Sequence, residues 1–214
     1  MNLKKIFLLS TLIFLLVLIS GCLTTLHPIF TERDLVYKPE LTGNWRTKDN
    51  NNEGSAQISS LAKEKSIELP GKISSIKDKG YLVTYKNKDG NVSGIYIAFL
   101  ARIGKHLYFD YYPVSMEAQK KEDEFYMQHF VKMHTPYRLD ILKDGGFELS
   151  QLEGSYLDQL IEEKKIRIHH ELNSDGNVVI TASTEELQQY ILKYGDDPGI
   201  IRKEKTTFSR SINE

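Results

Sequence analysis

The strongest constraint on the fold of this chain is a series of alternating segments joined by two glycine-containing turns. From Tyr81 to Lys86, aromatic and branched side chains recur at every second position, which is the period of a β-strand. Asp89-Gly90 then supplies the residue types of a tight hairpin turn, and a second strand is expected from Val92 to Ile103. Gly104-Lys105 is another two-residue turn, after which His106 to Tyr112 returns as a third strand. The sequence therefore predicts an antiparallel meander.

The third of these strands has two distinct faces. Alternation places one set of side chains on one face, Leu107, Phe109 and Tyr111, and another set on the opposite face, His106, Tyr108, Asp110 and Tyr112. Two further hairpins are expected, one over residues 137–149 around Asp144-Gly145-Gly146 and one over residues 166–182 around Asp175-Gly176. A shorter strand is expected at Ser66 to Leu69.

Helices are expected between these strands. Ser155 is expected to cap a helix that runs to about residue 164. A clearer signal is the capping box of Ser183 and Glu186, followed by apolar residues at helical spacing up to Gly195. A third helix is expected within Met116 to Val131. The prediction is an α+β fold, in which a mainly antiparallel β-meander forms a barrel or a sandwich with about three interspersed helices.

The N-terminus has the layout of an export signal. Lys4 and Lys5 precede an apolar run from Ile6 to Ile19, and the small residues Ser20-Gly21 precede Cys22. As a helix this run of 14 residues spans about 21 Å at ~1.5 Å per residue. That length falls short of the ~30 Å hydrocarbon core, so a lasting transmembrane helix is not expected.

The stretch Leu18-Ile19-Ser20-Gly21-Cys22 resembles the lipobox of bacterial lipoprotein signal peptides. The resemblance implies a diacylglyceryl thioether on Cys22, cleavage before it, and acylation of the new amino group. The alternative is an ordinary signal peptide followed by a coincidental cysteine. Cys22 is the sole cysteine of the chain, which excludes an intrachain disulfide.

These features divide the chain into three parts. Residues 1–21 are expected to be a lipoprotein signal peptide, residues 22–40 a tether leading into the fold, and residues 41–214 a single β-rich globular domain. The whole chain has a formal charge of -1, and loss of Lys4 and Lys5 with the signal changes it to -3. Because this charge is mixed along the chain and forms no basic stripe, binding to nucleic acid is not expected.

Candidate catalytic and metal-binding residues are few. His129 and His134 lie five residues apart, which does not place both on one helical face, and the adjacent pair His169-His170 points to opposite faces of a strand. His170, on the apolar face, is expected to be a satisfied core histidine and His169 a solvated one. No metal site or cofactor is therefore expected, and no nucleophile elbow or phosphate-binding loop occurs. Asp110, among several tyrosines, is expected to cap a turn or bind a tyrosine hydroxyl rather than act in catalysis.

The chain has 12 tyrosines. Tyrosines on a sheet can line a ligand pocket, since the ring offers area and the hydroxyl offers direction. They also suit the ordinary half-buried surface of a sheet, and the sequence favours this second interpretation.

Several segments resemble a family of uncharacterised bacterial envelope lipoproteins. They are Phe30 to Tyr37, Leu41 to Trp45, Leu100 to Pro113, His134 to Arg138 and Thr181 to Leu187. The resemblance implies no established activity. Gly43-Asn44-Trp45 also resembles the Gly-x-Trp that opens the first strand of lipocalin-type barrels, where the tryptophan closes the barrel end.

Together these observations favour a lipid-anchored, non-enzymatic module in the cell envelope. It is expected to contact the membrane through Cys22 and to bind a small apolar ligand or an envelope protein. Leu23 after the cysteine resembles the pattern of outer-membrane sorting in Gram-negative cells. The alternative is an envelope enzyme with a site assembled from dispersed residues such as His129, His134 and Asp110.

Overall fold

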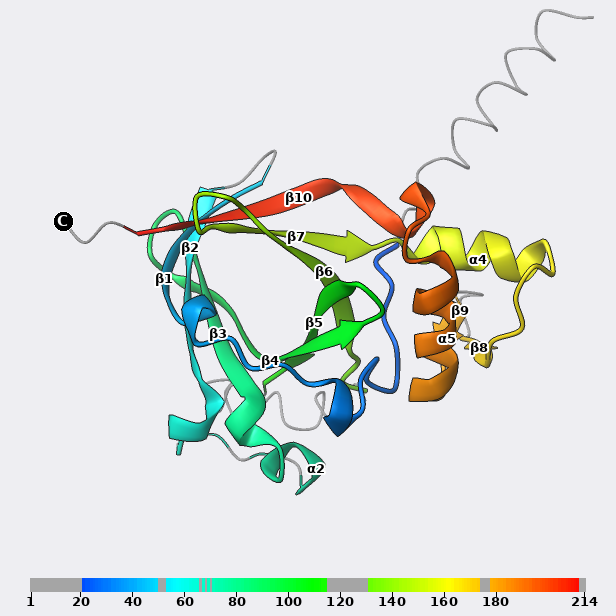
Figure 1. Cartoon of the computed structure of the whole chain (residues 1–214), viewed down its shortest axis with the longest axis horizontal. Coiled ribbons are helices and arrows are strands. Elements are labelled where there is room, and N and C mark those ends of the chain that lie inside the picture. Colours follow the sequence, from blue (N-terminus) through cyan, green and yellow to red (C-terminus); the bar gives the residue numbers. More distant parts are fainter. Residues whose placement is uncertain are drawn as a thin grey trace, which may run out of the picture.

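The computed structural model shows a closed antiparallel β-barrel (Figure 1). It describes residues 21–49, 53–65, 67, 69, 71–114, 131–173 and 178–211. The barrel strands are β1 (Gly43–Lys48), β2 (Glu53–Ser60), β3 (Gly80–Asn87), β4 (Val92–Ile103), β5 (His106–Pro113), β6 (Thr135–Ile141), β7 (Phe147–Leu152) and β10 (Ile201–Arg210). Each strand pairs with its neighbour in this order, and β10 closes the barrel by pairing with β1, where Trp45 lies opposite Arg210.

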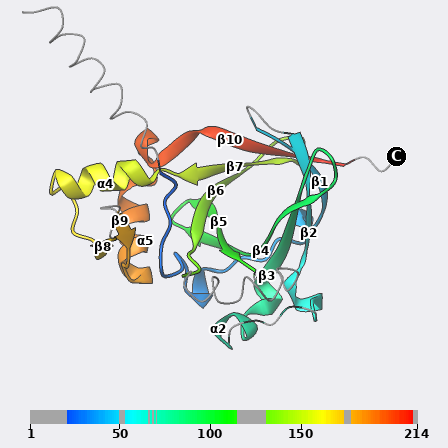
Figure 2. The same ribbon diagram turned by 180° about the vertical axis from the view of Figure 1, so that it is seen from behind.

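The remaining elements lie outside the barrel wall. Between β7 and β10 the chain forms α4 (Gly154–Glu162), the two-stranded sheet of β8 (His170–Leu172) and β9 (Val178–Ile180), and α5 (Thr184–Tyr194), which lie together beside the barrel (Figure 2). The short helix α2 (Gly71–Ser74) lies between β2 and β3. Single 3-10 turns occur at Glu32–Asp34, Pro39–Leu41, Leu61–Lys63, Lys77–Lys79 and Pro198–Ile200.

The predicted α+β fold is confirmed. Of the two predicted arrangements, a barrel or a sandwich, the protein forms a barrel. The meander has the expected hairpins, with Gly90 and Gly104 in the left-handed region at φ values of 83° and 60°. The hairpin of β6 and β7 is confirmed as well. The helix expected within Met116 to Val131 falls almost wholly on residues 115–130, and the turn at Asp175-Gly176 on residues 174–177, which lie outside the described residues.

Some boundaries differ from the sequence prediction. Ser155 is not the N-cap of α4. Glu153 is, because its carboxylate accepts a hydrogen bond from the Ser155 backbone N–H. The strand expected from residue 166 begins only at His170. Ser66 and Glu68 of another expected strand lie outside the described residues, and neither Ile67 nor Leu69 is in a strand.

Two apolar clusters lie on opposite sides of the barrel wall. One fills the interior and includes Trp45, Val83, Leu100, Phe109, Leu139, Phe147 and Phe208. The other packs α4, α5 and the N-terminal segment against the outside of the wall, and includes Phe99, Tyr108, Leu152, Leu157, Leu187 and Tyr190. Tyr108 and Phe109 thus belong to different clusters, as the predicted alternation of β5 requires.

One end of the barrel, which carries the start of β1 and the end of β10, is filled by side chains. Trp45 is completely buried there, and its Nε1 donates a hydrogen bond to the Leu41 carbonyl at 2.9 Å. The guanidinium of Arg210 lies 4.2 Å from the centre of the indole ring and donates to the Thr42 carbonyl at 2.8 Å. This is the closed end of the barrel. Trp45 therefore has a packing role at this end.

Candidate functional site

The opposite end of the barrel, called the open end here, contains a cavity of about 860 Å³. It lies between the hairpin joining β1 to β2, the hairpin joining β3 to β4, the start of β6 and the end of β7. Its volume is within the range of ligand sites for small molecules. The cavity is therefore the candidate site of this protein.

The cavity exists because the inward-facing side chains change in size and polarity along the strands. In the closed half they are large and apolar. In the open half the same faces carry small or hydroxyl-bearing residues, among them Thr47, Gly54, Gly94, Thr135 and Thr206. Such residues cannot fill the interior, so the packed core ends and a hollow begins.

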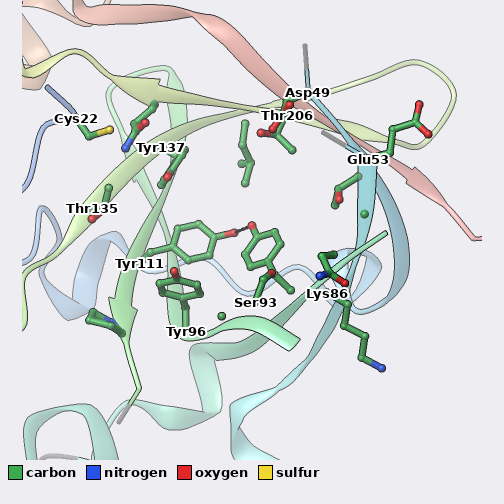
Figure 3. Close-up of a pocket in the computed structure, with 18 of the residues that line it drawn as sticks. Cys22, Asp49, Glu53, Lys86, Ser93, Tyr96, Tyr111, Thr135, Tyr137 and Thr206 are labelled. Atoms are coloured by element: carbon green, nitrogen blue, oxygen red, sulfur yellow. Dashed lines mark hydrogen bonds between the residues drawn. The ribbon is translucent and has the colours of Figure 1, made fainter. Parts of the chain in front are cut away.

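Tyrosines form the wall of the cavity nearest the core. Tyr85, Tyr96, Tyr111 and Tyr137 all line it, and the rings of Tyr96 and Tyr137 lie edge-on to that of Tyr111 at 5.8 and 5.2 Å between centroids (Figure 3). The hydroxyls of Tyr85 and Tyr111 are 3.0 Å apart. One of the two hydroxyl protons makes this hydrogen bond, which leaves the other to donate elsewhere. These four tyrosines thus line a cavity, the alternative that the sequence did not favour.

The hydroxyls of Tyr85, Tyr111 and Tyr137 remain neutral at physiological pH. Burial raises the pKa of Tyr85 and of Tyr111 well above the usual value near 10, and burial raises the pKa of Tyr137 to about 12. A neutral tyrosine both donates and accepts a hydrogen bond, and its ring offers an apolar face. The inner wall therefore suits an uncharged or apolar portion of a ligand.

The rim of the cavity is polar and carries both charges. Lys86 and Lys88 contribute cations, and Asp49, Glu53 and Asp89 contribute anions. Figure 3 shows Lys86, Glu53 and Asp49 on one side of the mouth, with Cys22 on the other. The arrangement of a tyrosine wall inside and charges outside matches a molecule with one apolar and one polar end.

Cys22 itself lines the cavity. It is exposed, it forms a β-bridge with Glu153 directly after β7, and its Sγ lies 3.3 Å from Nη1 of Arg202. No motif around Cys22 predicted a position beside a cavity, because the packing of this residue depends on contacts with distant segments such as Glu153 and Arg202.

The segment after Cys22, expected to be a tether, lies along the barrel wall. The backbone N–H of Leu23 donates to Leu152 at 3.0 Å, and that of Thr25 donates to His134 at 2.9 Å. Leu23, Thr25 and Ile29 are all buried. The segment then pairs with the edge of β4, through a β-bridge between Leu35 and Ala101 and a hydrogen bond from the Val36 N–H to the Leu100 carbonyl. It reaches the closed end at Leu41.

The structure brings together two of the three residues of the enzyme hypothesis. Oδ1 of Asp110 lies 3.0 Å from Nδ1 of His134, and its Oδ2 accepts a hydrogen bond from the Ile29 N–H at 2.9 Å. The expected partner of Asp110, a turn or a tyrosine hydroxyl, is therefore wrong. Both side chains face outward from the wall beneath the N-terminal segment, whereas Tyr111 faces the cavity. His129 lies outside the described residues.

The other predicted histidines are not part of the cavity. His170 is half-buried, and its Nδ1 lies 2.8 Å from the Ile168 carbonyl. His170 is therefore satisfied, but it does not lie in the core as expected. His169 is exposed, as expected, and its Nδ1 lies 2.6 Å from a carboxylate oxygen of Glu186. Within the described residues, no three His, Cys, Asp or Glu side chains form a group that could hold a metal ion.

None of the helices that the structure describes is both long enough and apolar enough to cross a bilayer. Comparisons of the chain with protein-family models, with curated proteins and with solved structures find no match.

Proposed function

We propose that this protein is a lipid-anchored lipoprotein of the cell envelope whose barrel binds a small amphipathic molecule in the open-end cavity. The observation that carries the proposal is the cavity of about 860 Å³, with a tyrosine wall inside and a charged rim outside. The lipobox-like stretch before Cys22 supports the anchor, and the resemblance to envelope lipoproteins supports the location. The polar rim supports an amphipathic ligand, whereas the sequence led us to expect a small apolar ligand or an envelope protein.

Binding is favoured over catalysis by the position of the acidic and histidine groups. Asp110 and His134 form a close pair, but they lie under the N-terminal segment and on the side of β5 opposite the cavity. A catalytic dyad needs access to a reacting atom, and this pair instead holds the backbone of Ile29.

Native mass spectrometry of the purified full chain tests the proposal. A matched pair of variants assigns the binding site: Thr206→Trp adds a large ring inside the cavity, and Thr207→Trp adds the same ring to the outer face of β10. We expect the wild type and Thr207→Trp to retain a bound amphiphile. Thr206→Trp should weaken its binding at least about tenfold, which corresponds to about 1.4 kcal/mol.

Two results would contradict the proposal. Equal binding by both tryptophan variants would place the ligand elsewhere on the molecule. A wild-type protein that carries no molecule after purification, and takes up none from a panel of fatty acids and detergents, would leave the cavity without a ligand of this class.

A further inference from the structure

We propose that the open end of the barrel faces the bilayer in which Cys22 is anchored, and that the cavity takes acyl-chain amphiphiles directly from that bilayer. This inference rests on the proposed function and adds the source and the chemical class of the ligand. It is carried by the place of Cys22 on the cavity wall and by the lack of free chain between Cys22 and the barrel.

No linker separates Cys22 from the folded barrel. Leu23, the residue directly after Cys22, is only 2% exposed and its N–H is bonded to the end of β7. Thr25 is completely buried, and its backbone both donates to and accepts from the backbone of His134. One extended residue spans at most ~3.6 Å. A lipid on Cys22 is therefore held within about one residue and one side chain of the barrel.

Cys22, the residue that carries the proposed anchor, lies at the mouth of the cavity. Cys22 lies on the cavity wall near Tyr137 and Thr135, as Figure 3 shows. Acyl chains that enter a membrane from Cys22 must draw this rim to the membrane surface, while the closed end with Trp45 and Arg210 points away from it.

The chemistry of the cavity matches an amphiphile that arrives in this orientation. The head group of a bilayer amphiphile already lies at the surface that the rim faces, so it can remain at the rim, among Lys86, Lys88 and Asp89, while the chain swings out of the hydrocarbon toward the tyrosine wall. Tyrosine and lysine both pair an apolar portion with a polar tip, so they suit a boundary between hydrocarbon and water. A ligand delivered from the bilayer in this way does not have to cross bulk water.

The orientation can be measured without any bound ligand. The lipidated full chain is inserted into vesicles of phosphatidylcholine and phosphatidylglycerol whose acyl chains carry bromine, which quenches nearby tryptophan. Lys88→Trp reports on the open end, and Lys105→Trp, in the turn between β4 and β5, is the matched control at the closed end. We expect quenching of the tryptophan at position 88 and none at position 105 or at Trp45. Equal quenching at positions 88 and 105 would overturn the orientation.

Loading from the bilayer is tested with a variant that has a flexible linker between Cys22 and the barrel. Ten glycine and serine residues inserted between Cys22 and Leu23 give a linker with a root-mean-square length of roughly 17 Å. Vesicles that contain cis-parinaric acid serve as the donor, and energy transfer from the protein's aromatic residues reports uptake. We expect the linker variant to load several-fold more slowly than the wild type and to reach the same final occupancy.

The outcomes separate this inference from the proposed function. Equal loading rates in the wild type and the linker variant, with normal final occupancy, would overturn delivery from the bilayer and leave binding intact. No uptake of cis-parinaric acid by either protein would overturn the acyl-chain ligand and with it this inference, whatever the quenching shows.

Discussion

At the scale of single residues, Asp110 connects the barrel to the N-terminal segment that follows Cys22. It is 1% exposed, and its two carboxylate oxygens are used by different parts of the chain, one near His134 and one by the backbone of Ile29. A buried carboxylate with two such partners is stable only while both remain in place. The N-terminal segment is thus fixed by a polar contact as well as by the burial of Leu23 and Ile29.

We expect Asp110→Asn to destabilise the protein by about 1.5–3 kcal/mol, the usual contribution of hydrogen bonds to a charged group. The change keeps the shape of the side chain but removes the charge that faces His134 and Ile29. Urea unfolding, followed by circular dichroism, measures the loss. Asp78→Asn, at an exposed position of a 3-10 turn, is the control and should change stability by less than about 0.5 kcal/mol. An unchanged unfolding midpoint for Asp110→Asn would show that the contact contributes little.

The sequence predicted which side chains share a face of a strand. It did not predict what each face packs against. Alternation placed Phe109 and Tyr111 together and Asp110 opposite them, as the structure confirms. Both faces of β5 are buried, one in the interior and one beneath other elements, so the pattern did not show which face lined a hollow. The cavity depends on Thr47, Gly54, Gly94 and Thr206, which come from four strands and form no local motif.

At the scale of elements, the hairpins and α5 were predicted well because their turns and caps are local. Two barrel strands, β2 and β10, had no such signal. Phe208 is the only large apolar residue of β10 that is fully buried. Apart from the half-buried Ile201, the other residues of the strand have charged or hydroxyl side chains. A strand that faces a polar cavity on one side and solvent on the other has no reason to alternate apolar with polar residues.

The capping box of α5 allows a quantitative test at this scale. Ser183 accepts a hydrogen bond from the Glu186 N–H, and Glu186 accepts one from the Ser183 N–H at 3.0 Å. Ser183→Ala removes the first of these and should cost about 1 kcal/mol, within a usual range of about 0.5–2 kcal/mol. Thermal unfolding measures the loss. Ser209→Ala, at an exposed position in β10, is the matched control and should be close to neutral.

At the scale of the whole molecule, the barrel is a meander whose last strand is separated from the others in the sequence. After β7 the chain leaves the wall to form α4, the β8–β9 sheet and α5, and it returns only with β10. β10 pairs with β7 on one side and with β1 on the other, so it fills a gap that no other described strand fills. The fold class was within reach of sequence reasoning, whereas closure between two distant segments was not.

We expect removal of residues 201–214 to abolish cooperative unfolding, because it exposes the edges of β1 and β7 and uncovers Trp45 and Phe147. Differential scanning calorimetry and near-ultraviolet circular dichroism measure the loss. Removal of residues 212–214 alone is the control and should leave the transition unchanged. A cooperative transition in the longer deletion would mean that the barrel wall is complete without β10.

Because β10 closes the barrel by pairing with β1, the cavity is enclosed only when both strands are present. A ribosome delivers β1 some 150 residues before it delivers β10, and until then the first strand has one unpaired edge and the future cavity is an open curved sheet. A nascent polypeptide that lacks β10 therefore has no complete wall around this space.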